Sequence, residues 1–247
     1  MMINIIYSEF LKLKKSYLSI WVLLAGVFIP GMMMVAGITD YGYDITNKNV
    51  CLNTITNINV FQLQFLDTIV FSLVSGYIFS REYTNRTANS LYSYPVSRFK
   101  IVSGKFITIL GLIMVVYIIN FISIFAVSLI LFNGSFIGEI MYTQLKMTIV
   151  SFGIQIILVP IPALLGCMTK NIIFPTIYGV VGAVISMFMS LNAVYIQLCP
   201  FLLPSVPFYY FYRGDPIDYI AVVLSGGGTF ILTSVLLIFY LRKCDVN

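Results

Sequence analysis

The sequence contains no histidine among its 247 residues, and only 9% of its residues are charged. Without histidine the chain has no histidine general base, no histidine metal ligand and no Ser-His-Asp triad. A soluble domain would carry roughly a quarter charged residues. The shortage of charge therefore argues against a soluble protein, and the missing histidine removes many forms of covalent catalysis.

Other groups that carry chemistry are scarce as well. The four cysteines stand far apart and form no C-x-x-C pair, so they predict neither a metal site nor a redox motif. The phosphate-binding pattern G-x-x-x-x-G-K-[ST] does not occur, so the chain itself is not expected to bind a nucleotide. No cofactor and no metal are predicted for this chain.

What the sequence has in abundance is apolar residues, which make up 60% of it. They form continuous runs near the length of about 20 residues that a membrane helix needs, and they do not alternate as barrel strands do. We predict an all-α integral membrane fold that forms a single transmembrane domain over residues 1–247. Its six transmembrane helices are expected at about 17–38, 60–80, 106–132, 143–167, 172–191 and 217–241.

Residues 1–16 precede the first span. Ile3, Ile6, Phe10 and Leu13 recur at helical spacing and lysines follow them, which predicts an amphipathic helix in the membrane interface. The alternative is a charged leader that only orients the first span. Between spans five and six, residues 192–216 are too apolar for an ordinary loop and too rich in proline for a straight span, which predicts a re-entrant segment.

The basic residues indicate how the chain is oriented. With both termini in the cytoplasm, eleven of the fourteen lysines and arginines fall on the inner side, including those of the basic loop 81–105. The net charge of +5 is explained by these helix ends and does not indicate a nucleic-acid partner. Cys51 and Cys199 both fall on the predicted outer side, so a disulfide is one hypothesis, although sequence gives no distance between them.

The second span is the most polar, and Pro160 with Pro162 should break the fourth. Polar side chains within a membrane face protein or water, so we predict that they line a pathway. The alternative for Asp67 is a position at a helix start near the headgroups. The pathway candidates are Gln64, Asp67, Thr68, Ser72 and Ser75, and all except Asp67 share one helical face.

The loop after the second span carries a recognisable pattern. An acidic residue is followed by a threonine, a short segment suited to a helix, a Pro-x-Ser-Arg sequence and a lysine that enters the third span. The residues are Glu82, Thr87, Leu91, Pro95, Ser97, Arg98 and Lys105. This pattern, with the six-span layout, resembles the ABC-2 type permeases. Length and layout are most similar to permeases of peptide export and of self-protection against lantibiotics or bacitracin.

The resemblance implies a division of labour. Such a permease pairs with a second copy or a sister permease, and two separate ABC ATPase subunits bind ATP and Mg and dock below. A cytoplasmic coupling helix between spans two and three, expected within residues 84–94, would sit in a cleft of the ATPase. The alternative is a topogenic loop on anionic lipid. The residues implied in docking are Glu82, Thr87, Leu91, Tyr92, Tyr94, Pro95 and Arg98.

The function predicted on this basis is export, by a multi-pass protein of the bacterial plasma membrane. The substrate would be hydrophobic or amphipathic, with an antimicrobial or toxin peptide as the first hypothesis. Export of a small drug, a lipid or a polysaccharide is the alternative within transport. A membrane scaffold or sensor without an ATPase partner is the alternative of another class.

Overall fold

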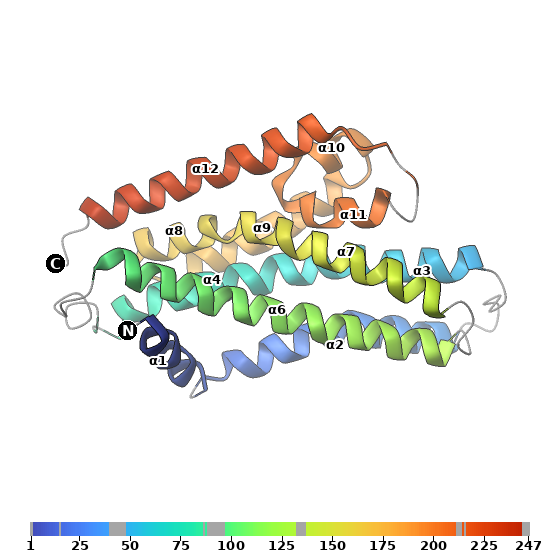
Figure 1. Ribbon diagram of the computed structural model, residues 1–247, viewed down its shortest axis with the longest axis horizontal. Helices are drawn as coiled ribbons and strands as arrows, with labels where there is room; N and C mark the ends of the chain where they lie inside the picture. The colour runs from blue at the N-terminus through green and yellow to red at the C-terminus, as the bar shows by residue number, and fades with distance from the viewer. Residues whose placement is uncertain are drawn as a thin grey trace.

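The computed structural model describes residues 2–14, 16–39, 48–85, 87, 97–131, 137–210, 214 and 216–243. Every regular element within these ranges is a helix, and the long helices lie side by side in one elongated bundle (Figure 1). The helices are α1 Met2–Lys14, α2 Leu18–Thr39, α3 Lys48–Phe61, η1 Gln62–Asp67, α4 Thr68–Thr84, α6 Arg98–Leu131, α7 Ile137–Leu158, α8 Pro160–Thr169, α9 Ile173–Met189, α10 Ala193–Leu198, η2 Pro200–Ser205, α11 Val206–Phe208 and α12 Tyr219–Lys243.

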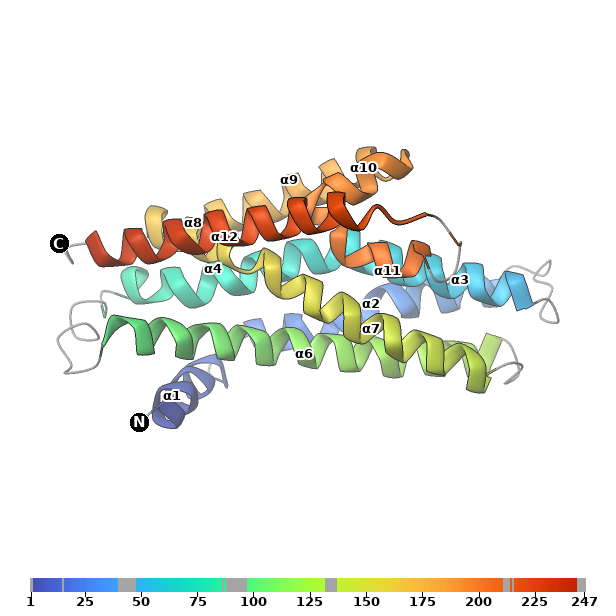
Figure 2. The same cartoon turned by 45° about the horizontal axis from the view of Figure 1, so that its top comes forward.

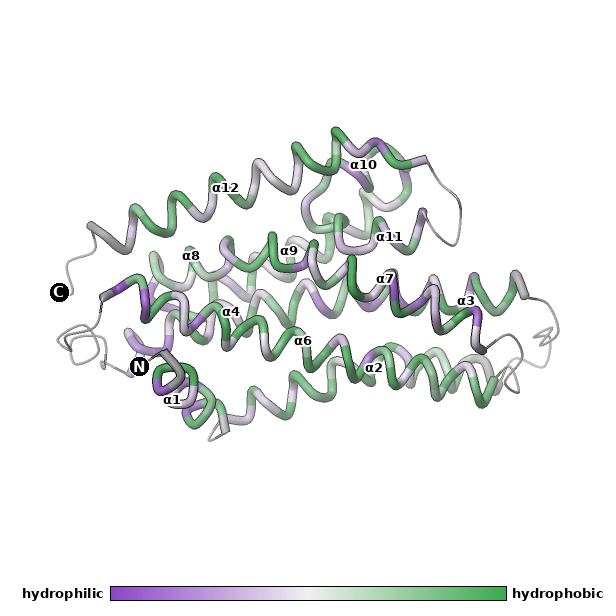
Figure 3. Tube along the Cα trace, in the orientation of Figure 1, coloured by the Kyte–Doolittle hydropathy of each residue, from purple (hydrophilic) through white to green (hydrophobic). Residues whose placement is uncertain are grey.

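The bundle has two distinct ends. Helix α1, the end of α4, the start of α6 and the end of α12 all lie at the end where both termini are marked, which we call the terminal end (Figure 1). The starts of α3 and α7 and the short helices α10 and α11 lie toward the opposite, far end. Hydrophilic residues concentrate on α1, at the adjoining ends of α4 and α6, and on α3 and α7 (Figure 3).

The predicted spans are all helical, and they differ in length. Within the described residues, five helical stretches are long and apolar enough to cross a membrane, and α9 is a shorter apolar helix. The structure thus supports a multi-pass membrane protein. The five long stretches are Leu18–Ala36, Val50–Thr84, Arg98–Leu131, Gly138–Thr169 and Tyr219–Tyr240.

The prediction that the second span begins near residue 60, after a polar loop, was wrong. Helix α3 begins at Lys48 and runs directly into η1 and α4, so the helix of the second span starts well before residue 60. Threonine hydroxyl groups in α3 donate hydrogen bonds to backbone carbonyls of the preceding turn, as Thr54 Oγ1 does to Val50 O at 2.9 Å. Ile55 and Ile58, both 0% exposed, bury the apolar face of α3 in a core shared with α6 and α7.

A π-helical stretch, η1, joins α3 to α4. Such a wide turn inserts one residue into the ordinary helical repeat and so rotates the side chains on either side of it relative to each other. Asp67 closes this turn in the middle of a continuous helix. The alternative that Asp67 stands at a helix start near the headgroups was therefore wrong.

The predicted break in the fourth span is present. Helix α7 ends at Leu158, Val159 forms a turn, and α8 begins at Pro160. Prolines lack the backbone N–H that the next helical turn requires, so the Val159 N–H bonds to Ile156 O at 3.3 Å in an i→i−3 pattern. The third span also differs from its prediction, because α6 starts at Arg98 rather than near residue 106.

The proline-rich segment between α9 and α12 forms three short helices, α10, η2 and α11. Leu202, Leu203 and Phe208 are at most 1% exposed, so much of the segment lies inside the protein rather than on its surface. It packs mainly against α7, η1, α9 and α12. Buried, irregular backbone of this kind at membrane depth is tolerated where protein surrounds it.

Helix α4 occupies the centre of the bundle between α8 and α9. At Gly76 an added Cβ would lie 2.2 Å from Pro175 Cβ of α9, and at Gly166 of α8 it would lie 2.9 Å from the Gly76 carbonyl oxygen. Only a hydrogen atom fits at these two positions, which allows three backbones to approach closely.

Helix α1 crosses the bundle beside α6 at the terminal end (Figures 1 and 2). An added Cβ at Gly104 of α6 would lie 2.7 Å from Ile5 Cγ2, so the two helices touch there. Leu13 is 3% exposed and joins the main core, whereas Tyr7 is 65% exposed. The predicted helix over residues 1–16 is confirmed at 2–14, with one face packed on protein.

Candidate functional site

Four charged side chains from three helices meet at the terminal end of the bundle. Glu9 and Lys12 come from α1, Glu82 from the last turn of α4 and Lys105 from the second turn of α6. Glu9 and Glu82 are each 4% exposed and Lys105 is 2% exposed. We call this group the ion cluster.

The two carboxylates each accept hydrogen bonds from both ammonium groups. Lys12 Nζ lies 2.7 Å from Glu82 Oε1 and 3.0 Å from Glu9 Oε1. Lys105 Nζ lies 3.2 Å from Glu82 Oε1 and 3.3 Å from Glu9 Oε1, and it also donates to Ile78 O at 3.0 Å. The formal charges cancel, so burial of the cluster leaves no net charge in the protein interior.

Burial of ions is costly unless each one is paired and hydrogen-bonded. Burial alone lowers the pKa of Lys12, but its hydrogen bond to Glu82 and the nearby charge of Glu9 outweigh that effect and raise its pKa. Lys12 is thus held as a cation by carboxylates from two helices. The cluster ties α1 to α4 and α6 more specifically than apolar contact alone could.

Thr87 links the ion cluster to the predicted coupling segment. Its hydroxyl donates to Glu82 Oε2 at 2.7 Å, and its backbone N–H donates to Glu82 O at 2.9 Å. Both oxygens of the Glu82 carboxylate therefore accept hydrogen bonds, Oε1 from the two lysines and Oε2 from this threonine. The segment that follows α4 is therefore hydrogen-bonded to the ion cluster at Thr87.

The remaining docking candidates lie largely beyond this point. Arg98 is exposed at the first turn of α6, where the Ser97 carbonyl accepts from the Lys100 N–H at 2.9 Å. Most of the expected coupling helix lies outside the described residues. The docking candidates that fall there are Leu91, Tyr92, Tyr94 and Pro95.

Sequence reasoning grouped Glu82, Thr87 and Lys105 but missed Glu9 and Lys12 as their partners. Glu9 is the only acidic residue among the first sixteen, and it lies three residues before Lys12. A single carboxylate in an otherwise apolar and basic amphipathic helix could have indicated an ion pair with a cation of another helix.

The pathway candidates of the second span are all buried within the protein. Gln64 donates to Ser205 Oγ at 3.1 Å and to Tyr209 OH at 3.2 Å, which fastens the π-helical turn to the short helices η2 and α11. The other four candidates divide between two sides of the helix, and each side faces its own small cavity.

Asp67 is 2% exposed and accepts a hydrogen bond from Gln62 Nε2 at 2.6 Å. The same Gln62 nitrogen donates to Ala25 O of α2 at 3.0 Å. Asp67 also borders a cavity of about 10 Å³ with Tyr117 and Asn120 of α6. That volume is about what one water molecule needs.

Thr68, Ser72 and Ser75 border a different cavity, also of about 10 Å³, together with Gln155 and Tyr178. Ser75 Oγ is buried without a hydrogen-bond partner in the described part of the chain. Among the described residues, these side chains border a space of about the volume that one water molecule needs, which is too small to be a passage for a substrate.

Neither metal binding nor disulfide formation is indicated by the described residues. Within the described ranges, no three His, Cys, Asp or Glu side chains gather as a metal site would require. The hypothesis of a Cys51–Cys199 disulfide was wrong, because no such bond is formed. The two residues belong to separate apolar clusters, Cys51 with α3 and α6 and Cys199 with the main core.

The described helices form a bundle suited to a multi-pass membrane protein, with a buried charge cluster at its terminal end. The family described as ABC-2 family transporter protein matches residues 5–186, well over half of the chain, and includes the whole ion cluster. The chain belongs to this family, whose members are the membrane components of ABC transporters and not their ATPases. No curated protein sequence matches the chain.

Proposed function

We propose that this protein is the membrane-spanning subunit of an ABC exporter and that the ion cluster transmits ATPase movement to its helices. The observation that carries the proposal is the bonding of Glu82 to Lys12 of α1, Lys105 of α6 and Thr87 of the coupling segment. A rigid, fully paired cluster moves as one unit, so a displacement of the segment after α4 would be passed to α1 and α6 together.

The proposed topology has six crossings and both termini in the cytoplasm of a bacterium. The terminal end would then be the cytoplasmic end, which agrees with the excess of lysine and arginine in segments assigned to it. Helix α9 would supply the sixth crossing, with the buried helices η2 and α11 completing the outer half of the membrane domain as a re-entrant segment.

The proposed assembly contains two permeases, as two copies or as sister subunits, and two ABC ATPase subunits that bind ATP and Mg. Docking would use Leu91, Tyr92 and Tyr94 as apolar contacts, with basic residues such as Arg98 at the rim. Glu82 and Thr87 would act behind the contact surface, since their side chains bond to each other.

The proposed substrate is a hydrophobic or amphipathic peptide, such as an antimicrobial peptide or toxin, removed from the membrane or cell. It is supported by the overall apolarity of the chain and by the lack of groups for covalent chemistry. A small drug, a lipid or a polysaccharide is the second candidate within transport. A scaffold or sensor predicts that no ATPase depends on the segment after α4.

The test is co-purification from the native host in mild detergent, followed by an assay of ATPase activity. A Leu91→Asp/Tyr94→Asp double variant is expected to lose the ATPase subunit while the permease remains folded. The matched control is Leu191→Asp/Tyr195→Asp, which places the same charges at two exposed positions, one between α9 and α10 and one in α10. It is expected to retain the ATPase.

Retention of the ATPase by both double variants would contradict docking at this segment. Absence of any ATPase with the wild-type protein would favour the scaffold alternative. Once an ATPase is found, candidate peptides can be compared by the resistance that the intact complex gives to the host, with a catalytically dead ATPase as the reference.

A further inference from the structure

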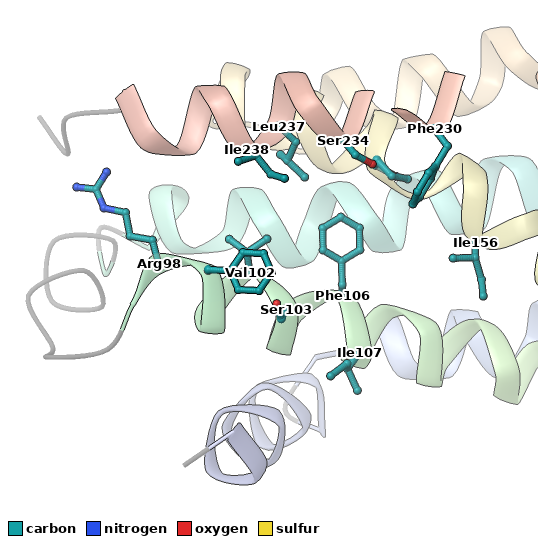
Figure 4. A pocket seen from close by; sticks show the side chains of 12 residues that line it. Arg98, Val102, Ser103, Phe106, Ile107, Ile156, Phe230, Ser234, Leu237 and Ile238 are labelled. Carbon is teal, nitrogen blue, oxygen red and sulfur yellow. The ribbon is translucent and has the colours of Figure 1, made fainter. Parts of the chain in front are cut away.

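A groove of about 620 Å³ opens between α6 and α12 in the terminal half of the bundle (Figure 4). Its volume falls in the range of about 300–1,000 Å³ that is typical of ligand sites. It lies apart from the polar side chains of the second span. Its lining residues come from α6, from the junction of α7 and α8, and from α12.

The groove lies beside the break in the fourth span. Helix α7 packs along α6, and α12 packs on both α8 and α7. Ile156 and Pro160, on either side of the turn at Val159, are the parts of this span that line the groove.

The walls of the groove are almost entirely apolar. Val102 and Phe106 follow Arg98 at intervals of four residues on α6, and Phe230 and Ile238 face them from α12 (Figure 4). Long, parallel apolar walls of this kind accept an extended hydrocarbon chain, because each CH₂ group that leaves water favours burial.

A charged side chain stands at one end of the groove. Arg98 is among the lining residues and lies at the terminal end of the groove (Figure 4). A guanidinium group binds phosphate through paired hydrogen bonds. One positive charge at the mouth of an apolar groove is complementary to one anionic head on an apolar chain.

We propose that the groove binds an anionic phospholipid of the surrounding bilayer, with one acyl chain between α6 and α12 and the phosphate at Arg98. The headgroup would lie at the level where α6 enters the membrane, and the chain would follow the helices inward as the lipid tails of that leaflet do. Arg98 is also part of the proposed docking surface, but occupancy of the groove by lipid can be measured on the permease alone, without an ATPase.

The first experiment titrates the full-length, delipidated permease with phosphatidylglycerol or with phosphatidylcholine of the same acyl chains, followed by native mass spectrometry. We expect retention of one phosphatidylglycerol in preference to phosphatidylcholine. Arg98→Gln should weaken phosphatidylglycerol binding about fivefold, the factor that corresponds to ~1 kcal/mol for one basic side chain at an anionic surface. Lys100→Gln, an exposed cation on α6 outside the groove, is the matched control and should change little.

A second pair of variants tests the apolar part of the site. Ser234→Phe projects a ring into the groove and should abolish retention of the lipid, whereas Val235→Phe, at a 59% exposed neighbouring position outside the groove, should not. Equal retention in both phenylalanine variants would overturn the proposal. Equal affinity for the two lipids, unchanged by Arg98→Gln, would overturn it as well.

A bilayer measurement keeps the proposal testable if Ser234→Phe does not fold. Trp21 is the single tryptophan, so Phe230→Trp in a Trp21→Phe background reports from the groove alone. Brominated phosphatidylglycerol should quench this tryptophan more strongly than brominated phosphatidylcholine does. Equal quenching by both lipids, or no quenching because a second permease covers the groove, would overturn the proposal.

Discussion

Lys12 of the N-terminal helix and Glu82 at the end of α4 are joined by a hydrogen-bonded ion pair of 2.7 Å, although 70 residues separate them in the chain. Glu82 also bonds to Lys105 and Thr87, so one carboxylate is shared by three parts of the protein. Its partners make the ion cluster a structural joint between α1, α4 and α6.

The first prediction concerns Glu82→Gln. The substitution leaves two buried or half-buried lysines with only Glu9 as a counter-charge, and loss of one partner from a buried pair costs about 3–5 kcal/mol. We expect a clearly lower thermal unfolding midpoint in detergent. Glu139→Gln, which removes an exposed carboxylate from the first turn of α7, is the control and should leave the midpoint nearly unchanged.

The second prediction concerns alkaline pH. The pKa of Lys12 is raised above its ordinary value of 10.5 in the folded protein. Its contribution to stability is therefore complete below pH 10.5 and is lost as the pH rises through the folded pKa. The unfolding midpoint of Lys12→Met should start lower but fall less steeply above pH 10.5 than that of the wild type. Parallel curves would show that Lys12 does not contribute in this way.

The third prediction concerns Gly76, where α4, α8 and α9 are in closest contact. Gly76→Ala places a methyl group against Pro175 and should destabilise the bundle by about 1–3 kcal/mol through overpacking. Gly153→Ala in α7 meets no atom within 4 Å and should be neutral or slightly stabilising. Chemical or thermal unfolding of the two variants side by side measures the difference. Equal effects would mean that the close approach at Gly76 is readily relaxed.

The fourth prediction concerns Asp67. Asparagine keeps an oxygen that can accept the bond from Gln62, and it removes a charge whose insertion costs about 2.5–3.5 kcal/mol at mid-bilayer. Asp67→Asn should therefore unfold no earlier than the wild type, whereas Asp67→Leu should unfold earlier. If Asp67→Asn also retains export in cells, its charge has no part in the pathway; loss of export with an intact fold would support the pathway hypothesis.

Much of the architecture was accessible from sequence because apolar runs and prolines act locally. The break at Pro160 was predicted from the missing proline N–H, and the N-terminal helix from its apolar periodicity. The structure contains both. Helix α3 was missed because its asparagines and threonines lower its apparent hydrophobicity. In the structure those side chains bond within the protein, as Asn59 does to Gln144 of α7 at 3.2 Å.

Only half of the ion cluster could be predicted from the sequence, because its members come from distant parts of the chain. The motif grouped Glu82 with Lys105, but no local pattern says that Glu9 and Lys12 approach them from a helix at the other end of the sequence. Likewise, the single polar face expected for Gln64, Thr68, Ser72 and Ser75 assumes an uninterrupted α-helix. Gln64 lies in the π-helical stretch 62–67 and bonds to Ser205 and Tyr209, whereas the other three border a cavity that Gln64 does not line, and sequence periodicity cannot predict such a stretch.

The composition of the ion cluster also sets an order on how the newly synthesised chain matures. Glu9 and Lys12 leave the ribosome first, but Lys105 follows them by nearly a hundred residues, so the cluster cannot close until the third membrane helix has been inserted. Helix α1 therefore acquires its full set of charged partners only after residues far along the chain have been synthesised.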